Sequence, residues 1–466
     1  MNTNNENHEE TNTAPLPITA EAMNAAAGVP DAPVDYYNSN TKSFLVRNDS
    51  GRWLPHDVNS YKRILKSRGS KSRPGDGEIL SEMDVAILSV QNLRDITYHG
   101  PLCGRNTGLV AENGIRALVT EDMLLVDPVK GDFPTIQAFL TGLLIAGEEE
   151  EVGEFQRHTF CGWMKSSVEA LRAGVEQQQQ ALALCGPKDC GKSLLQHLIT
   201  EMLAGRSAKA VRYFSGASPF NADLFGAEHL ILEDDFGSTR IADRLRFGAR
   251  LKEHCVGVTT ASLHSKGHNA VNLRPWWRVT ITVNDDAEAM MILPPLDDHI
   301  ADKLILLRAS PFNFPMPVST NPERIAFRKQ LSAEIPAFLF WLLHEYQIPA
   351  PCVDPRRYNV ATYHHPVLRK NLEALSPESD LLDLIDSAFA GEFRTRGTIE
   401  MKADEIENRL MAFNPRRTEK ILPHRNSSGT YLGRLAKKHP ERVIPRRTSD
   451  DRWWLLKAPL CSSNSN

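Results

Sequence analysis

A short glycine-rich segment carries the side chains with the clearest chemical role. Residues 186–193 read GPKDCGKS, which fits the pattern G-x-x-x-x-G-K-S. Glycines let backbone N–H groups turn towards phosphates, and a helix N-terminus adds a favourable dipole. Lys192 would pair with the β- and γ-phosphates, and the Ser193 hydroxyl would bind Mg²⁺. We therefore expect ATP and Mg²⁺ as cofactors, held by Gly186, Pro187, Lys188, Asp189, Cys190, Gly191, Lys192 and Ser193.

A second apolar run is followed directly by carboxylates. Residues 229–232 read HLIL and are followed by Glu233, Asp234 and Asp235. One carboxylate there would hold the water shell of Mg²⁺, and the next would orient or deprotonate the attacking water. We assign Glu233 to the metal and Asp234 to the water, with Asp235 as the alternative. An acidic turn after a strand is common by chance, so the assignment depends on the glycine-rich segment before it.

A third apolar run, residues 278–283, ends in Asn284. An asparagine at this place can hydrogen-bond the attacking water or the γ-phosphate. The alternative is that Asn284 only caps a turn after a buried strand. The order of the three motifs along the chain favours the functional interpretation.

These side chains need elements that bring them together. An apolar strand at 181–185 precedes the glycine-rich segment, and an amphipathic helix at 194–200 follows it. A chance glycine-rich turn would lack that setting. From residue 181 onwards, short apolar runs alternate with longer helical ones, which is typical of a parallel sheet covered by helices. The pattern predicts an α/β fold with a phosphate-binding core.

Composition and periodicity divide the rest of the chain. Residues 1–35 are rich in Asn, Glu, Thr, Ala and Pro, which predicts a disordered tail. In the N-terminal domain we expect a basic helix at 61–67 and strands at 117–119 and 123–126. Further helices are expected at 155–173 and 322–346. The predicted units are an α/β N-terminal domain at 36–150, the core at 151–310, a helical extension at 311–375, a last domain at 376–459 and a frayed tail at 460–466.

The last domain shows the element order of a winged helix. Its expected elements are helices at 381–389, 404–413 and 429–438, a strand at 398–401 and a hairpin at 442–456. A winged helix can grip duplex DNA through its third helix and its wing. Arg434 and Arg447 are the DNA-binding candidates. Winged helices also dock proteins, so that alternative stays open.

The charge balance limits how the protein could meet nucleic acid. There are 54 Lys and Arg against 58 Asp and Glu, a formal net charge of -4. This excludes a uniformly basic nucleic-acid coat, so contacts must come from local patches. The densest basic run lies between Lys62 and Arg73. It could hold phosphates or could be a solvated helix face, and the sequence favours neither.

Cysteine usage and hydropathy indicate the compartment. The seven cysteines show no metal-ligand spacing and no disulfide framework. The N-terminus lacks the basic and apolar regions of a signal peptide. No apolar run approaches the roughly 20 residues that span a bilayer. We expect a cytoplasmic protein without a membrane partner.

At this point the residues resemble a superfamily III helicase, the compact AAA+ branch of viruses, phages and mobile elements. The likeness rests on GPKDCGKS, LILEDDF, Ser265-Lys-Gly-His268 and LRPWWRVTITVND. It is nearest to the helicase part of the primase-helicases of phages and large DNA viruses, and it covers about residues 150 to 460. The resemblance implies an AAA+ sheet and a ring, usually a homo-hexamer, that hydrolyses ATP and moves along single-stranded DNA.

The resemblance also implies roles for individual residues. In the family a hairpin before the sensor strand contacts DNA, and the matching positions here are Lys266 and His268. A cation also reaches the neighbouring subunit's γ-phosphate. Arg308 is our candidate for it. Lys303 is the alternative, because it stands where the family usually has an arginine.

Three functions follow as hypotheses. The leading one is an ATP-dependent helicase that acts on single-stranded or forked DNA in the replication of a phage, plasmid or integrated element. A replication initiator or loader is the second, and a nucleotide-gated scaffold ATPase is the third. We identify no paired metal-binding aspartates before the core, because Asp122 and Asp127 fit turn positions. A separate primase is therefore an expected partner.

Overall fold

Five short strands pair in parallel to form the central sheet. Its strands are β8 (Ala181–Cys185), β9 (Ser207–Lys209), β10 (His229–Leu232), β13 (Arg278–Val283) and β14 (Leu304–Arg308), in the order β14-β8-β13-β10-β9. The three strands predicted from the sequence and their parallel pairing are confirmed. The computed structural model describes residues 34–112, 114–233, 241–256, 260–297, 299–422, 427–447 and 452–459. Of the expected tails, 1–35 lies outside these ranges except for residues 34 and 35, and 460–466 lies entirely outside them.

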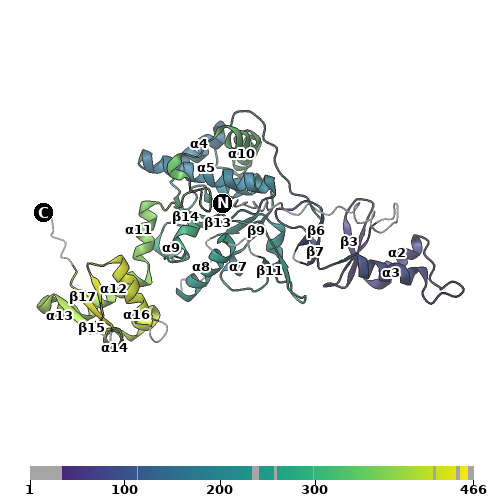
Figure 1. Cartoon of the computed structure of the whole chain (residues 1–466). Coiled ribbons are helices and arrows are strands. Elements are labelled where there is room, and N and C mark those ends of the chain that lie inside the picture. Colours follow the sequence, from purple (N-terminus) through teal and green to yellow (C-terminus); the bar gives the residue numbers. More distant parts are fainter. Residues whose placement is uncertain are drawn as a thin grey trace, which may run out of the picture.

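Alternating side chains of the sheet enter two different hydrophobic clusters. In β8, Leu182 and Leu184 pack into one cluster, whereas Ala181, Ala183 and Cys185 pack into the other. This follows from the two-residue period of a strand. The first cluster contains helices α4 (Pro134–Leu144), α5 (Glu150–Ala173), α6 (Lys192–Met202) and α10 (Asn321–Phe340). The second contains α7 (Val211–Phe214) and α8 (Ile241–Val256), so helices cover both faces of the sheet (Figure 1).

A buried polar chain ties helix α6 to two strands of the sheet. The His229 ring hydrogen-bonds the hydroxyl of Thr200 through Nδ1 and that of Thr280 through Nε2, each at 2.7 Å. Gln196 Nε2 donates to the same Thr280 hydroxyl at 2.9 Å. Burial lowers the pKa of His229 to about 3, so the ring is neutral. The chain fixes the helix that starts at Lys192 against β10 and β13.

The N-terminal part of the chain forms two small sheets. One has the order β3-β2-β1-β4, from β1 (Tyr36–Asn38), β2 (Ser43–Arg47), β3 (Trp53–His56) and β4 (Asp95–Ile96). Helices α2 (Val58–Ser67) and α3 (Glu82–Leu93) lie between β3 and β4 in sequence. The other sheet has the order β5-β7-β6, from β5 (Tyr98–Gly100), β6 (Gly108–Glu112) and β7 (Ile115–Val119). The predicted basic helix and the strand at 117–119 are confirmed.

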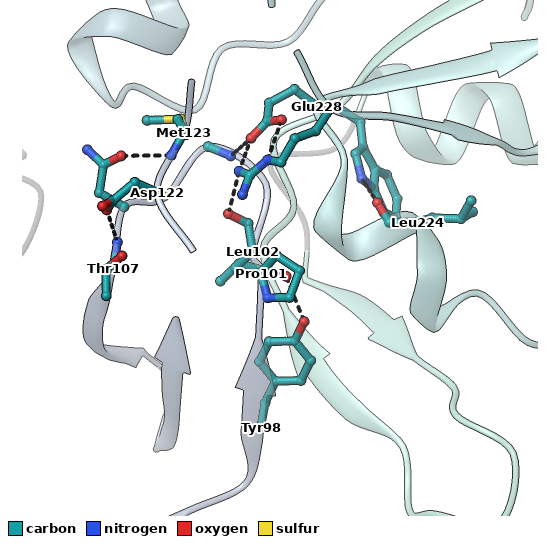
Figure 2. Close-up of polar contacts among 12 residues, drawn as sticks. Tyr98, Pro101, Leu102, Thr107, Asp122, Met123, Leu224 and Glu228 are labelled. Carbon is teal, nitrogen blue, oxygen red and sulfur yellow. Dashed lines mark hydrogen bonds and ion pairs between the residues drawn. The ribbon is translucent and has the colours of Figure 1, made fainter. Parts of the chain in front are cut away.

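The strand predicted at residues 123–126 is wrong, because that segment pairs with no strand. The Met123 N–H instead donates to Asn106 Oδ1 at 3.1 Å, and Asp122 Oδ1 accepts the Thr107 N–H at 2.7 Å (Figure 2). These Thr107 hydrogen bonds lower the pKa of Asp122. The apolar residues Met123, Leu125 and Val126 pack against the core cluster without joining a sheet. Asp122 therefore connects two segments 15 positions apart rather than bounding a strand.

A buried carboxylate joins the N-terminal part to the core. Glu228 is fully buried just before β10 and accepts the Gly104 N–H at 3.0 Å. It also accepts from the Arg206 guanidinium, whose Nε lies 2.9 Å away. The same arginine donates to the carbonyl of Leu102 at 3.3 Å (Figure 2). A buried charge is tolerated when it is paired and hydrogen-bonded, which Glu228 is.

The predicted helix at 322–346 starts at Asn321 after a capping box made by Thr320 and Glu323. Its α-helical part ends at Phe340, and a π-helical turn continues to Glu345. One short 3₁₀ turn, Ala350–Cys352, follows this helix, and another, Ala222–Gly226, lies between α7 and β10. No helix of the described ranges is long and apolar enough to cross a membrane.

The C-terminal elements form a unit at one end of the molecule, opposite the N-terminal sheets (Figure 1). Its three-stranded sheet has the order β15-β17-β16. All the elements predicted there are present, with two further short helices, α13 and α15. The winged-helix assignment stays a prediction. The elements are α11 (Pro366–Ala374), α12 (Pro377–Ala388), α13 (Ala390–Arg396), β15 (Thr398–Lys402), α14 (Ala403–Phe413), α15 (Pro415–Ile421), α16 (Ser427–Lys438), β16 (Val443–Arg447) and β17 (Arg452–Lys457).

The buried neutral His229 predicts acid sensitivity of the core. Its folded pKa of about 3 lies below the ordinary 6.5, so the unfolded chain binds more protons between these values. Stability should be fully present above pH 6.5 and should fall as the pH drops towards 3. The loss from His229 alone should be about 2–3 kcal/mol between pH 7 and 4.5. Denaturant titrations at both pH values measure it.

The His229→Gln variant separates this effect from general acid denaturation. A glutamine keeps hydrogen-bonding groups but cannot take up a proton, so the variant should lose less stability on acidification. His197→Gln is the control, because His197 is an exposed histidine on α6; in this variant the free energy of unfolding should keep the wild-type pH dependence. An unchanged pH dependence in His229→Gln would contradict the assignment.

Candidate functional site

The glycine-rich segment forms the loop between β8 and α6. Gly191 is the N-cap of α6 and has φ +105°, a backbone conformation that favours glycine. At Gly186 a Cβ atom would come within 2.3 Å of the Ala309 carbonyl oxygen, so only glycine fits. Burial raises the pKa of the Cys190 thiol in the same loop, which therefore stays neutral. The loop has the shape that the sequence pattern predicts.

Lys192 is the first residue of α6, and its side chain contacts both the loop and Asn284 of the third motif. Its Nζ donates to the carbonyls of Gly186 and Pro187, each at 2.7 Å, and to Asn284 Oδ1 at 3.2 Å. The structure therefore brings together two predicted site residues that are 92 positions apart. The turn after β13 is capped by Asp286, which accepts the Ala289 N–H at 2.9 Å. Asn284 is thus not the cap of that short helix.

Glu233 follows β10 at the same edge of the sheet. Because β13 lies between β8 and β10, Glu233 stands one strand beyond Asn284. Its carboxylate forms an ion pair with Lys209 Nζ at 2.7 Å. Asp234 and its alternative Asp235 lie outside the described residues. The predicted division of roles between Glu233 and Asp234 stays a prediction.

Ser193 is exposed in the first turn of α6, directly after Lys192. Within the described ranges, no group of three or more His, Cys, Asp or Glu side chains could hold a metal ion. A magnesium ion that arrives with a nucleotide needs few protein ligands, because phosphate oxygens and waters supply most of them. A hydroxyl and one carboxylate at this edge of the sheet fit that mode of binding.

A pocket of about 540 Å³ opens beside the loop, and half of its wall was not predicted. The loop contributes residues from Lys188 to Leu194 except Cys190. The other wall comes from the segment after β14 and from α10, and consists of Phe314, Val318, Arg324, Phe327 and Arg328. The sequence signal was present as a phenylalanine-rich run before a well-capped helix. No local sequence pattern linked this run to the glycine-rich loop, which lies more than 100 residues earlier.

The two candidate cations lie at opposite ends of β14. Arg308 ends the strand beside Cys185, and its guanidinium pairs with Glu148 at 3.1 Å. Glu148 also bonds His365 Nε2 at 2.9 Å. Lys303 precedes the strand in a short 3₁₀ turn, Ala301–Lys303, where it is buried and paired with Asp302. Arg308 is therefore at the phosphate-loop edge of the sheet and Lys303 is at the far edge.

The stretch before β13 is a hairpin, as the family resemblance implies. Its strands are β11 (Ala261–Leu263) and β12 (Val271–Leu273), which pair antiparallel. Lys266 and His268 lie in the connecting loop, and both are exposed. The structure thus presents both side chains to solvent on one loop, which is what contact with a phosphate backbone requires.

The N-terminal part braces this loop through one side chain. Asn40 Nδ2 donates to the Asn269 carbonyl and Asn40 Oδ1 accepts the Asn269 N–H, both at 3.0 Å. The turn that carries Asn40 is held by the buried Asn38, whose Oδ1 accepts the N–H of Asn40 at 2.9 Å. Asn38 Nδ2 is in turn 2.9 Å from the His99 ring. Sequence reasoning gave no sign of this contact, since its two ends are 229 positions apart.

The basic residues of the C-terminal unit differ in their surroundings. Arg434 on α16 pairs with Glu378 at 3.2 Å and lies over the Tyr431 ring. Arg447 is exposed at the end of β16. In the N-terminal part, Arg68 of the predicted basic run pairs with Asp35 at 2.5 Å. A role of these residues in DNA binding stays a prediction.

Comparison with known proteins supports the fold alone. No family model matches the chain, and no curated protein matches it. Among solved structures, the A form of the apo NrS-1 C-terminal region has a TM-score of 0.51, 14% identity, and 91% of this chain and 96% of that chain covered. A second apo structure of that region has a TM-score of 0.51 and 13% identity over 91% and 95%. An active helicase, SCCmec type IV Cch, has a TM-score of only 0.34 at 9% identity, which carries no argument.

The Asn40→Ala substitution should loosen the hairpin loop. It removes both hydrogen bonds to Asn269, so local opening should become easier and the Asn269 amide should exchange about tenfold faster. Hydrogen exchange of the full chain measures this. Exposed Asn59→Ala on α2 is the matched control and should leave the loop unchanged. Equal exchange in Asn40→Ala and wild type would show that the brace does not hold the loop.

Proposed function

We propose that this chain is an ATP-dependent, ring-forming DNA helicase of superfamily III, with a parallel AAA+ sheet. The observation that carries the proposal is the meeting of Lys192 with Asn284 at the carboxyl edge of the sheet. It joins a phosphate-binding lysine to a side chain able to sense the γ-phosphate. The likeness to the NrS-1 C-terminal region supports the fold on which this site is built.

In this proposal ATP binds across the loop and the neighbouring pocket. The backbone N–H groups of residues 188–191 and the N-terminus of α6 hold the phosphates. Lys192 exchanges the carbonyls of Gly186 and Pro187 for phosphate oxygens, and Asn284 lies beside the γ-phosphate. Mg²⁺, held by Ser193 and through water by Glu233, would neutralise charge on the phosphates. Asp234 or Asp235 would orient the attacking water.

The unpredicted wall of the pocket fits the rest of the nucleotide. Phe314 and Phe327 are 5.8 Å apart between ring centroids and belong to a larger cluster of phenylalanines. Such an apolar surface suits a nucleobase, since flat rings gain from dispersion and stacking. Arg324 and Arg328 are exposed on the same side of α10 and could reach phosphate or ribose oxygens.

The remaining assignments concern DNA and neighbouring subunits. In a homo-hexamer, Lys266 and His268 would contact single-stranded DNA inside the ring. Arg308 would break its ion pair with Glu148 and contact the γ-phosphate of the nucleotide bound to the neighbouring subunit. Arg434 and Arg447 would hold duplex DNA, with a separate primase as partner. The alternative is an AAA+ initiator or loader, which a sequence-specific DNA footprint dependent on Arg434 and Arg447 would favour. Processive unwinding distinguishes the two.

The Lys192→Ala substitution should abolish hydrolysis and unwinding. It removes the cation that meets the phosphates, so turnover should fall about 100-fold or more. The measurement is strand displacement from a forked DNA duplex with ATP and Mg²⁺, together with phosphate release. Lys252→Ala, at an exposed lysine on α8, is the control that should retain activity. Retained turnover in Lys192→Ala would refute the site; wild-type hydrolysis without displacement would favour the initiator.

Replacing Lys266 and His268 together by Ala should remove the response to DNA. The loop loses its cation and its imidazole, while the nucleotide pocket keeps every residue. Stimulation of hydrolysis by single-stranded DNA should therefore disappear, and basal hydrolysis should stay within about twofold of wild type. Exposed Lys329→Ala on α10 controls for loss of any surface charge. Full stimulation in the double variant would place the DNA contact elsewhere.

A further inference from the structure

The first residue of β13 is a buried cation. Arg278 has only 3% of its surface exposed. Its Nε donates to Ser167 Oγ and its Nη1 to the Trp277 carbonyl, each at 2.9 Å. The guanidinium also lies 4.0 Å above the Trp276 ring. The third nitrogen, Nη2, has no hydrogen-bond partner among the described residues.

Burial lowers the pKa of Arg278 to about 9, which still leaves it protonated at neutral pH. Within the described ranges, no Asp or Glu forms an ion pair with it, whereas the nearby Arg206 is paired with Glu228. A buried ion without a partner is strongly destabilising, so proteins pair such groups or bind a compensating ion.

A small cavity of about 30 Å³ adjoins the guanidinium, and its lining is rich in donors. Residues 176–179 and 274–278 line it together with His254, and among them Glu176, Gln179, Arg274, Trp276 and Arg278 carry polar side-chain atoms. Four of the buried nitrogens without a partner belong to these residues: Arg278 Nη2, Arg274 Nε, Trp276 Nε1 and His254 Nε2. The one unpartnered oxygen is Gln179 Oε1. Donors therefore exceed acceptors around the cavity.

The other ionisable groups of the lining do not neutralise Arg278. Glu176 is engaged by Arg105 at 3.2 Å and by Arg274 at 3.7 Å. Burial lowers the pKa of His254 to about 4, so its ring is neutral at physiological pH. A neutral imidazole can still donate through Nε2 if its proton lies there. The lining thus holds Glu176 and Arg274, which pair with each other, neutral donors, and the Arg278 guanidinium, which forms no ion pair with the described residues.

We propose that this cavity binds a small inorganic anion, either a halide or a compact oxyanion such as phosphate. Its volume is about twice what one water needs, which suits an ion of that size. Guanidinium and indole N–H groups are donors that suit such ions. The site is separate from the phosphate loop, because five residues of β13 lie between Arg278 and Asn284, which puts roughly 20 Å of strand between the two. The anion would balance the charge that anchors the start of the sensor strand.

The test is thermal unfolding of the full chain at constant ionic strength. Sodium gluconate, whose anion is too large for the cavity, is replaced stepwise by sodium chloride or by sodium phosphate. The melting temperature should rise with saturation by about 2–4 °C. The salt that acts at the lower concentration identifies the ion. Both titrations are repeated in Lys192→Ala, where a rise that persists cannot come from the phosphate loop.

Three variants connect the rise to the cavity. Arg278→Met should abolish it, and Trp276→Phe, which keeps an aromatic ring but loses the indole N–H donor, should raise the half-saturating concentration about fivefold. If Arg278→Met does not fold, Trp276→Phe alone decides. Trp453→Phe is the matched control, because this tryptophan lies on β17, in the C-terminal unit, next to Lys402. Its melting temperature should respond to both salts as that of the wild type does. Crystals grown in bromide should show an anomalous peak beside Arg278.

The contrary results are equally clear. A melting temperature that is the same in every salt, with only ordered water in the cavity, would overturn the proposal. So would a rise that survives unchanged in Trp276→Phe. Because none of these measurements uses ATP or DNA, they stand independently of the helicase assignment.

Discussion

The candidate site depends on the parallel pairing of β13 between β8 and β10. Parallel strands end at the same edge, so the residues that follow each strand are brought side by side. This places Lys192, Asn284 and Glu233 at one edge although they are far apart in sequence. The pairing of β10 with β13 is reinforced by His229 of β10, whose ring hydrogen-bonds the hydroxyls of Thr200 on α6 and Thr280 on β13. A neutral, fully bonded imidazole does this without introducing a charge into the core.

Buried charges are handled in different ways in the same molecule. Glu228 is paired with Arg206 and accepts a backbone N–H, which joins the N-terminal part to the core. Glu148 is shared between Arg308 and His365 at the opposite side of the sheet. Arg278, in contrast to these carboxylates, forms no ion pair with the described residues. That contrast makes the cavity beside it a distinct feature rather than part of the general polar interior.

The proposed DNA loop and the candidate sensor belong to one continuous piece of chain. The hairpin ends at Leu273, β13 begins at Arg278, and Asn284 follows its last residue. The loop is also fixed from outside by Asn40 of the N-terminal part. A movement of Asn284 would therefore reach the hairpin through β13, which is buried along its whole length. The hairpin is also held on its other side, by the hydrogen bonds of Asn40 to Asn269.

Local sequence patterns were sufficient to predict most elements around the site and the chemistry of the glycine-rich segment. The apolar runs at 181–185, 229–232 and 278–283 became strands, the segment 186–193 became a loop before a helix, and the order of C-terminal elements was as predicted. These features depend on residues close together in the chain, such as Gly191 before Lys192. The run at 123–126 failed because apolar residues can pack against a core without pairing in a sheet.

Contacts between residues far apart in the chain became visible only in the folded molecule. Phe314 and Arg324 face the phosphate loop, Asn40 holds Asn269, and Arg308 pairs with Glu148, and none of these contacts has a local sequence pattern. The same holds for Arg278, whose missing counter-charge becomes visible only when every neighbour is in place. Such contacts arise from how the layers and units pack, and packing brings together residues whose separation in the chain carries no periodic signal.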